Sequence, residues 1–432
     1  MSTLSDIKKS KNLIRSLGPG LMFASACIGT SHLVLSTRAG AHHGMIFLLI
    51  IVLALLFKYP FFEFGPRYAH ATGHSLLHGY KKQGRWAVIV YFLIIAVNMF
   101  AVPAAVGAVS AGILSTMMGM GGISFELLLG IVLAITVLLL LFGGFKILDS
   151  LVKFISVILL ISIGAAFVAV LIKGPVEPIA GFKAPPLLEG AGLALMISLV
   201  GWMPSGLETS TMHSIWAVEK MKSENLEPNI KLGLFDFNLG YIFTSVLAVM
   251  FLVIGIFTIY GSGQQLEGSS TELSNKLLNV FKTNLGEWLH PVFAIAAFGT
   301  IYGTLITVFD AFSRSLSWSL RALRFDIIEN NKEQNKFLEK YFKLALVLMG
   351  IGAFLLFKYS QASMIKMLEF ATIISFVSAP AIAFINLRAM NDPDFPAEHK
   401  PGFGLMLLSY VGIVVMVLFT VYYLMFGIGA GH

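Results

Sequence analysis

Charged residues are scarce in this 432-residue chain. Asp, Glu, Lys and Arg together make up 12% of it, whereas hydrophobic residues make up 57%. Soluble globular proteins contain about 25% charged residues. With a mean hydropathy of +0.83, the chain has too few polar groups to cover a soluble surface. The composition therefore excludes an ordinary soluble protein and indicates an integral membrane protein.

Cysteine is also nearly absent, since Cys27 is the only one. One cysteine excludes an internal disulfide and says nothing about the redox compartment. The sequence lacks a phosphate-binding loop, a dinucleotide fingerprint and a nucleophile paired with a base. We therefore expect neither an enzyme nor a cofactor. The first apolar run is preceded by a polar, basic segment without a cleavage site, so we expect no signal peptide.

Long apolar runs are plentiful. A helix that crosses a bilayer needs about 20 apolar residues, and eleven stretches meet this requirement. They are approximately 18–40, 44–64, 86–111, 124–143, 149–172, 189–216, 237–259, 287–311, 341–358, 363–387 and 404–427. The sequence therefore predicts an all-α membrane protein with about eleven transmembrane helices.

The net charge of +7 follows from where the basic residues lie. If the N-terminus is cytoplasmic, the N-terminal tail and the loops after spans 2, 4, 6, 8 and 10 hold 20 of the 30 Lys and Arg. The opposite side holds six. Since positive loops stay inside, we expect a cytoplasmic N-terminus, an outside C-terminus, insertion in the cell membrane and no nucleic-acid partner.

The first span is interrupted near its middle. Residues 18–41 are apolar enough to cross a bilayer, but Gly29, Thr30, Ser31 and His32 in the middle are poor residues with which to continue a helix. Glycine and hydroxyl residues there would free backbone carbonyls and amides at a depth where lipid cannot satisfy them. The sequence therefore predicts a broken helix that faces a cavity or another protein segment.

The sixth span has a similar interruption. Met203, Pro204, Ser205 and Gly206 divide its apolar run. Proline removes a backbone donor and clashes with the preceding turn, and glycine adds backbone freedom. Interrupted helices at matching places in two halves of a chain indicate a transporter's substrate site, because free carbonyls and helix ends can hold an ion or a polar solute.

The spacing of the two breaks predicts two halves of opposite topology. We expect a five-helix repeat over 18–172, an inverted repeat over 189–387 and an extra helix over 404–427, in one transmembrane domain spanning 1–432. A proline-rich linker, 173–187, separates the halves. Each half begins with a broken helix, as in 5+5 inverted-repeat transporters.

Glu208 is the carboxylate that we place deep within a span and away from a basic partner. An ionisable residue in a membrane is by default a functional candidate, and the alternative is a cap on the half-helix that follows the break. Residues four apart at span ends predict two helix-rim ion pairs, Glu63 with Arg67 and Asp310 with Arg314. The remaining polar residues near one span end, Asp236 and Asn238, we also expect at the rim.

Four short motifs resemble the Nramp (natural resistance-associated macrophage protein) family of proton-coupled divalent metal transporters. They are Gly18-Pro19-Gly20-Leu21, Ala39-Gly40-Ala41, Ala71-Thr72-Gly73 and Met203-Pro204. Their order and spacing cover most of the chain. The resemblance implies a LeuT-type fold in which helices 1 and 6 are discontinuous, and transport by alternating access.

The family's functional residues are only partly matched. Its first break reads Asp-Pro-Gly-Asn, and its Asp and Asn bind metal, whereas Gly29 to His32 stand there in this chain. Its second break reads Met-Pro-His-Asn, of which Met203 and Pro204 remain beside Ser205 and Gly206. Its acidic proton-pathway residues in span 3 fall on Asn98 and Ala101.

Two substrate classes remain open at this point. A divalent metal such as manganese or iron would use the Ala26 carbonyl, the His32 imidazole and the Met203 thioether, with Cys27 and Glu208 as further ligands. A small amino acid or organic acid would place its carboxylate on the half-helix amides at Thr30 to His32 and Ser205 to Leu207. A non-transporting sensor or binding protein is a third possibility.

The expected substrate-binding set therefore covers both breaks. It consists of Ala26, Gly29, Thr30, Ser31, His32, Met203, Ser205, Gly206 and Glu208, with Ala26, His32 and Met203 as metal ligands. His32 and Glu208 are the expected carriers of a coupling proton, because a histidine titrates near neutral pH. Sodium coupling stays open, and the lipid bilayer is the other expected partner.

Overall fold

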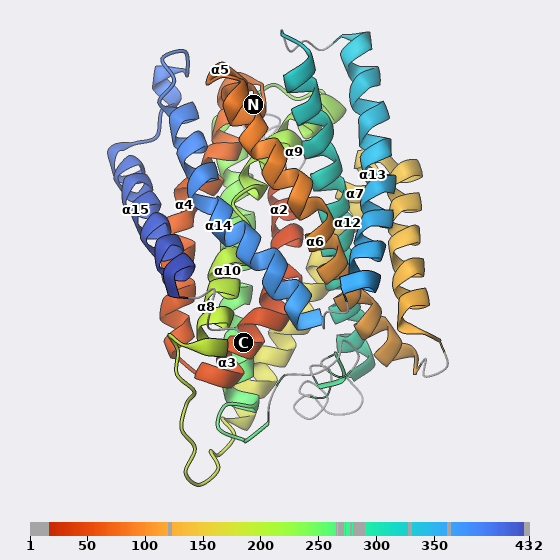
Figure 1. Ribbon diagram of the computed structural model, residues 1–432, viewed down its shortest axis with the longest axis vertical. Helices are drawn as coiled ribbons and strands as arrows, with labels where there is room; N and C mark the ends of the chain where they lie inside the picture. The colour runs from red at the N-terminus through yellow and green to blue at the C-terminus, as the bar shows by residue number, and fades with distance from the viewer. Residues whose placement is uncertain are drawn as a thin grey trace, which may run out of the picture.

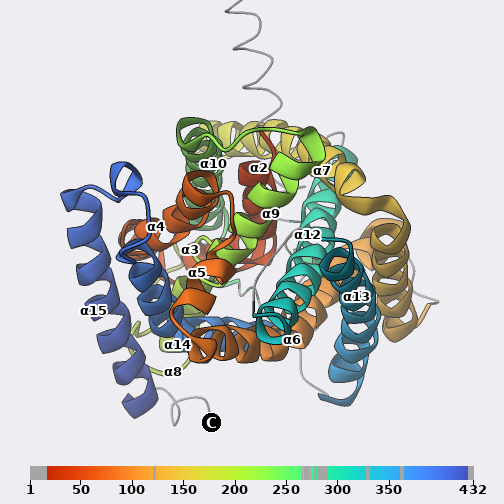
Figure 2. The ribbon, with the colours of Figure 1, turned by 90° about the horizontal axis from the view of Figure 1, so that it is seen from above.

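The computed structural model describes residues 17–119, 123–264, 266, 272, 274–276, 279, 290–326, 331–360 and 364–426. All regular elements in these ranges are helical, which confirms the all-α prediction. The long helices run roughly along one axis (Figure 1), and from above they surround α2 and α9 near the centre (Figure 2). The N-terminal basic residues that helped to predict orientation lie outside the described ranges.

The helices follow the predicted spans closely. They are α2 (Pro19–Ile28), η1 (Ser31–Ser36), α3 (Thr37–His43), α4 (Ile46–Thr72), α5 (Leu76–Lys82), α6 (Arg85–Met118), α7 (Phe125–Lys173), α8 (Gly190–Trp202), α9 (Thr209–Glu224), α10 (Ile230–Thr258), α12 (His290–Arg324), α13 (Lys332–Ser360), α14 (Met364–Met390) and α15 (Phe403–Phe426), with a short 3-10 turn, η2 (Ala397–His399). Within the described ranges, seven segments are long and apolar enough to cross a membrane, and one bent pair brings the total to eight.

Both predicted breaks are present. The first helix ends at Ile28, resumes as the π-helical η1 and continues as α3, with a bend of 44° between the two parts. The sixth span divides into α8 and α9, which are separated by Met203–Glu208. Helices 1 and 6 are therefore discontinuous, as the sequence predicted.

Spans 4 and 5 belong to one continuous helix, α7. Its 49 residues would extend about 73 Å if straight, at about 1.5 Å per residue. Figure 2 shows that α7 changes direction along its length. Its two apolar parts are Phe125–Gly143 and Val157–Lys173, so the expected two spans are joined by helix instead of a loop.

Close backbone contact fixes α2 against α10. A Cβ atom added to Gly20 would lie 2.0 Å from the Asp236 carbonyl oxygen, and one added to Gly240 would lie 2.1 Å from the Gly20 carbonyl oxygen. The Asp236 side chain accepts hydrogen bonds from the amides of Gly18 (3.0 Å) and Gly20 (2.6 Å). Asp236 was expected at the rim, but it is buried and caps the start of α2, where helical amides lack partners.

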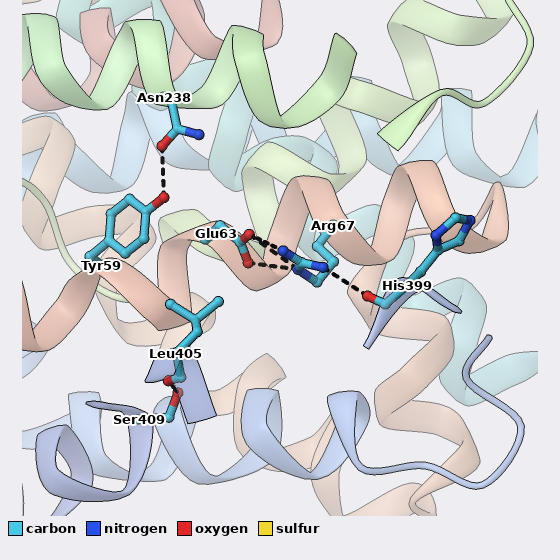
Figure 3. Close-up of polar contacts among 7 residues, drawn as sticks. All are labelled: Tyr59, Glu63, Arg67, Asn238, His399, Leu405 and Ser409. Atoms are coloured by element: carbon cyan, nitrogen blue, oxygen red, sulfur yellow. Dashed lines mark hydrogen bonds and ion pairs between the residues drawn. The ribbon is translucent and has the colours of Figure 1, made fainter. Parts of the chain in front are cut away.

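Both predicted ion pairs are present, but Glu63 and Asp310 are buried and not at an exposed rim. Arg67 donates to Glu63 at 2.9 Å and also to the His399 carbonyl at 2.8 Å, which ties α4 to the chain before α15 (Figure 3). Arg314 donates to Asp310 at 2.8 Å. The amide oxygen of Asn238 accepts a hydrogen bond from Tyr59 at 2.7 Å (Figure 3), so this side chain joins α10 to α4 and is not a free rim group.

The last helix, α15, lies at the edge of the bundle (Figure 2) and packs against α4 and α14. The linker after α7 is extended: Val176 and Ile179 donate backbone hydrogen bonds to Phe257 and Gly261, each at 2.9 Å. It thereby follows the end of α10 before α8 begins. The repeat boundaries at 18–172 and 189–387 stay a prediction.

Candidate functional site

The two helix breaks meet at one small cavity between α2, α6, α9 and α12. Its volume, counted as the space open to the centre of a water-sized sphere, is about 30 Å³. A water molecule needs roughly 10–15 Å³ on this measure, so the cavity has room for one or two waters or an ion. Six of the predicted site residues line it: Ala26, Thr30, Ser31, Ser205, Gly206 and Glu208.

Three other predicted residues are not brought to the cavity. Gly29 packs against α12, where an added Cβ atom would lie 2.5 Å from the Thr304 hydroxyl oxygen, so this glycine permits close helix packing. Met203 is fully buried but does not line the cavity. Of the three predicted metal ligands, therefore, only Ala26 lies at the cavity wall.

His32 points toward α10 and away from the cavity. Its Nε2 lies 2.8 Å from the Thr244 hydroxyl and 3.0 Å from the Thr244 carbonyl oxygen, and its Nδ1 lies 2.7 Å from the Ser31 hydroxyl. Both ring nitrogens therefore have partners. His32 therefore links the first break to α10, and one of its ring nitrogens would have to give up its contact before it could bind a metal.

Glu208 lines the cavity, as we expect if this residue takes part in substrate or proton binding. Its Oε1 accepts hydrogen bonds from Asn98 (3.2 Å) and Ser375 (3.0 Å), whereas its buried Oε2 has no hydrogen-bond partner. Glu208 is the N-cap residue of α9, and its side chain forms no capping hydrogen bond there. The electrostatic form of the capping alternative, a carboxylate at the start of the half-helix, stays a prediction. A buried, half-satisfied carboxylate is costly to retain and can receive a proton or a cation.

Sequence reasoning missed Lys58 of α4. This side chain is buried, and its Nζ donates to the backbone carbonyls of Val200 (2.7 Å), Gly201 (2.9 Å) and Ser205 (3.0 Å). The signal was present in the sequence: a lysine stands in the middle of an apolar run, and such residues mark functional sites by default. Lys58 brings a cation to the second break, beside the cavity.

The cavity offers few metal ligands. Cys27 supplies a thiol beside the Ser205 side chain, Glu208 supplies the carboxylate and Met212 a thioether. The remaining polar side chains are hydroxyls and the Trp202 indole. Among the residues that the structure describes, no group of three or more His, Cys, Asp and Glu is arranged to hold a metal ion. A cation bound here would also rely on neutral oxygen atoms.

Three histidines at a spacing of four, His70, His74 and His78, do not form a metal site. The rings of His74 and His78 meet edge to face at 4.4 Å, while His70 accepts a hydrogen bond from the Asn229 amide at 3.3 Å. Burial first, and then the neighbouring His74 and basic side chains, lower the pKa of His78 to about 4.

Comparison with known proteins identifies the family. The profile of the Nramp family, natural resistance-associated macrophage protein-like, matches residues 20–426. This chain belongs to the Nramp family. An uncharacterised protein of Pasteurella multocida, PM0681, is 33% identical over 414 residues, which cover 95% of this chain and 92% of that protein. The divalent metal cation transporter MntH of Staphylococcus saprophyticus is 23% identical over 96% of this chain and 92% of its own length.

Solved structures agree on the fold. The manganese transporter of Eremococcus coleocola superposes with a TM-score of 0.67 at 14% identity, covering 96% of this chain and 86% of that one. MhsT in complex with L-phenylalanine superposes with a TM-score of 0.57 at 14% identity, covering 93% and 98%. The Nramp-family chain thus has the LeuT-type fold of an integral membrane transporter, and the family is one of metal-ion transporters, not of enzymes.

Proposed function

We propose that this Nramp-family protein is a secondary transporter that moves a divalent metal cation of the manganese or iron type by alternating access. The observation that supports this most directly is the free Oε2 of Glu208 at the cavity between the two helix breaks. A divalent cation near the membrane centre needs at least one anionic ligand. Glu208 supplies that charge in a site that lacks the family's aspartate at Gly29 to His32.

The proposed ligands differ from those of the sequence prediction. Glu208 and the Cys27 thiol line the same cavity as the Ser205 hydroxyl and Ala26, whose carbonyl lies in the last turn of α2. A sulfur ligand suits transition metals better than magnesium, whereas the carbonyl and carboxylate oxygens also suit manganese. His32 and Met203 are left out of the ligand set because neither lines the cavity.

Calorimetric titration of the purified protein with manganese, cadmium and magnesium tests this function. We expect saturable binding of manganese and cadmium but not of magnesium, and Glu208→Gln should weaken it at least tenfold, or about 1.4 kcal/mol. Glu126→Gln, an exposed carboxylate on α7, is the matched control and should bind like the parent protein. Absence of binding by all three metals, or equal binding by Glu208→Gln, would rule this function out.

A second substrate class is favoured by Lys58. An ammonium beside the cavity attracts a carboxylate and repels a divalent cation, so a small organic acid or amino acid is the alternative substrate. The LeuT-type fold does not decide between the two, since superposable structures include a manganese transporter and a protein bound to L-phenylalanine. Thermal stabilisation by a panel of amino and organic acids, without stabilisation by manganese, would establish this alternative.

We also propose a coupling ion, the proton, and an orientation of the chain in the membrane. Glu208 would carry the coupling proton, because its carboxylate is buried and has one free oxygen. The two five-helix repeats would rock about the breaks with the N-terminus inside the cell and the C-terminus outside. Proton uptake by proteoliposomes under a manganese gradient tests the coupling, and loss of that uptake in Glu208→Gln is the expected result.

A further inference from the structure

Lys58 binds the second helix break in the way that a free cation would. Its three contacts all go to backbone carbonyl oxygens, those of Val200, Gly201 and Ser205, at 2.7 to 3.0 Å. The first two carbonyls belong to the last turn of α8, and the third follows in the break. Carbonyls of a last helical turn lack their usual i+4 amide partner. The Val200 carbonyl also accepts the Met203 amide, at 3.5 Å, and Lys58 donates to it at 2.7 Å.

The number of contacts identifies the charged form of the side chain. An ammonium has three N–H donors and no acceptor, which matches three carbonyl oxygens one to one. A neutral amine would turn its lone pair toward one of these oxygens. The negative end of the α8 dipole lies at the same place and favours a positive charge.

Charge-assisted hydrogen bonds are needed here because the site is dry. Lys58 is 2% exposed, and removing an ammonium from water is costly unless every donor is satisfied. The carboxylate of Glu208 acts on Lys58 electrostatically from the cavity side. Of the groups facing Lys58, Glu208 is the carboxylate that offsets its charge.

We propose that the three carbonyl oxygens form a monovalent-cation site and that the Lys58 ammonium is its permanent, tethered occupant. The native protein then holds a cation at the second break without binding sodium there. Removal of the ammonium should open the site to a free monovalent cation or to a small alkylammonium ion. This inference concerns the α8 end alone and holds whichever solute the cavity carries.

The test is chemical replacement of the missing group. Lys58→Ala deletes three carbons and the nitrogen, which are the atoms of n-propylammonium. The melting temperature of Lys58→Ala in detergent should be roughly 4 °C higher in saturating n-propylammonium chloride or sodium chloride than in choline chloride of equal ionic strength. The parent protein should show no such rise, and n-propanol should not replace n-propylammonium.

Lys81→Ala is the matched control, because Lys81 also donates to a backbone carbonyl, that of Ala322 at 3.0 Å, but to only one. It should not respond to either cation. If Lys58→Ala fails to fold in choline but folds when n-propylammonium or sodium is present, the inference is supported. If Lys58→Met is needed for purification, the same sodium response is expected, because the methionine side chain ends one atom before the position of Nζ and leaves the carbonyls free.

Three results would overturn the inference. They are equal cation responses in the parent protein and Lys58→Ala, no response in either Lys58 variant, and failure of both variants to fold with any of these cations. Manganese titration of the parent protein is a separate measurement. Failure of metal binding therefore leaves the cation site untouched, and failure of the cation response leaves the proposed transport function untouched.

Discussion

Asp236 is a single side chain on which the start of α2 depends. Its two carboxylate oxygens accept the amides of Gly18 and Gly20, and its side chain is buried. Replacement by alanine leaves these amides without partners, so Asp236→Ala should lower the free energy of unfolding by about 1–2 kcal/mol. Thermal unfolding in detergent measures this change.

Asp326→Ala is the control for Asp236. Its carboxylate is 93% exposed and lies 3.6 Å from Arg85, and such surface pairs contribute about 0–1 kcal/mol. A loss for Asp236→Ala no larger than that for Asp326→Ala would contradict the capping role.

At this scale the sequence predicted some side chains and missed others. Glu208 could be found because a lone carboxylate stands out in an apolar span, and its orientation into the cavity followed that logic. Lys58 carried the same signal and was overlooked. The direction of His32 could not be predicted, because the partner that turns it away, Thr244, is 212 positions later in the chain.

The crossing of α2 and α10 depends on glycine. A Cβ atom on Gly20 would lie 2.0 Å from the Asp236 carbonyl oxygen. That oxygen belongs to the backbone of α10, so it cannot move aside unless the helix moves. Gly20→Ala should therefore separate the helices and lower stability by roughly 2–3 kcal/mol, as overpacking does.

Gly164→Ala is the matched substitution, since an added Cβ atom there meets nothing within 4 Å. Alanine is the better helix former by about 1 kcal/mol, so this variant should unfold at an equal or higher temperature. A comparable loss of stability in both variants would show that Gly20 owes its place to something other than close packing.

We expect acid to destabilise the folded protein through His78 of α5. The folded-state pKa of His78 is about 4, lowered first by burial and then by His74, Lys82, Lys81 and Arg321, against about 6.5 in an unfolded chain. A lowered histidine pKa means that the folded state favours the neutral ring. Its stabilising contribution is present above pH 6.5 and is lost as the pH falls toward 4.

His78→Gln should therefore flatten the decline in melting temperature between pH 7 and pH 4, because glutamine does not titrate. Above pH 7 the melting temperature should depend on pH in the same way in His78→Gln and in the parent protein. A decline as steep in the variant as in the parent protein would assign the acid response to other groups.

Elements were predicted better than contacts. The spans and both breaks followed from hydropathy and from the position of glycine, proline and hydroxyl residues, which act locally. The expected separation of the spans 124–143 and 149–172 was wrong, because α7 continues from one to the other. Glycines inside a helix cost only about 1 kcal/mol each, and packing of the whole bundle compensates for that amount.

At the scale of the molecule, a polar network joins three helices on the α5 side of the cavity. The Tyr80 hydroxyl lies 2.7 Å from the Thr211 hydroxyl and donates to Asn386, and Asn386 donates to Ser210 at 2.8 Å. These bonds connect α5, α9 and α14. Opening of the cavity toward this face must break them.

The native Cys27 can report that opening, since it is 2% exposed and lines the cavity. Reaction with a water-soluble methanethiosulfonate reagent should be slow in the parent protein and several-fold faster in Tyr80→Phe, which lacks the hydroxyl. Tyr410→Phe, on the exposed side of α15, should label at the parent rate. Equal rates in all three proteins would exclude the network as a gate.

The overall architecture was predictable because a bilayer permits few solutions: each backbone polar group must be satisfied within helices or at a protected break. Substrate identity was not predictable in the same way. It depends on side chains from distant parts of the chain. Glu208 of the second break and Cys27 of α2 line a cavity of about 30 Å³, and Lys58 of α4 lies beside it on the Ser205 carbonyl.

The π-helical segment η1 has a consequence for movement. Its six residues, Ser31–Ser36, follow the i to i+5 bonding pattern, which inserts one extra residue into the α-helical register. If that insertion shifted along the chain, the residues it passed would each turn by about 100° about the helix axis, since an α-helix has 3.6 residues per turn. Such a register shift could rotate His32 and Ser31 together relative to α2 while the number of backbone hydrogen bonds stayed constant.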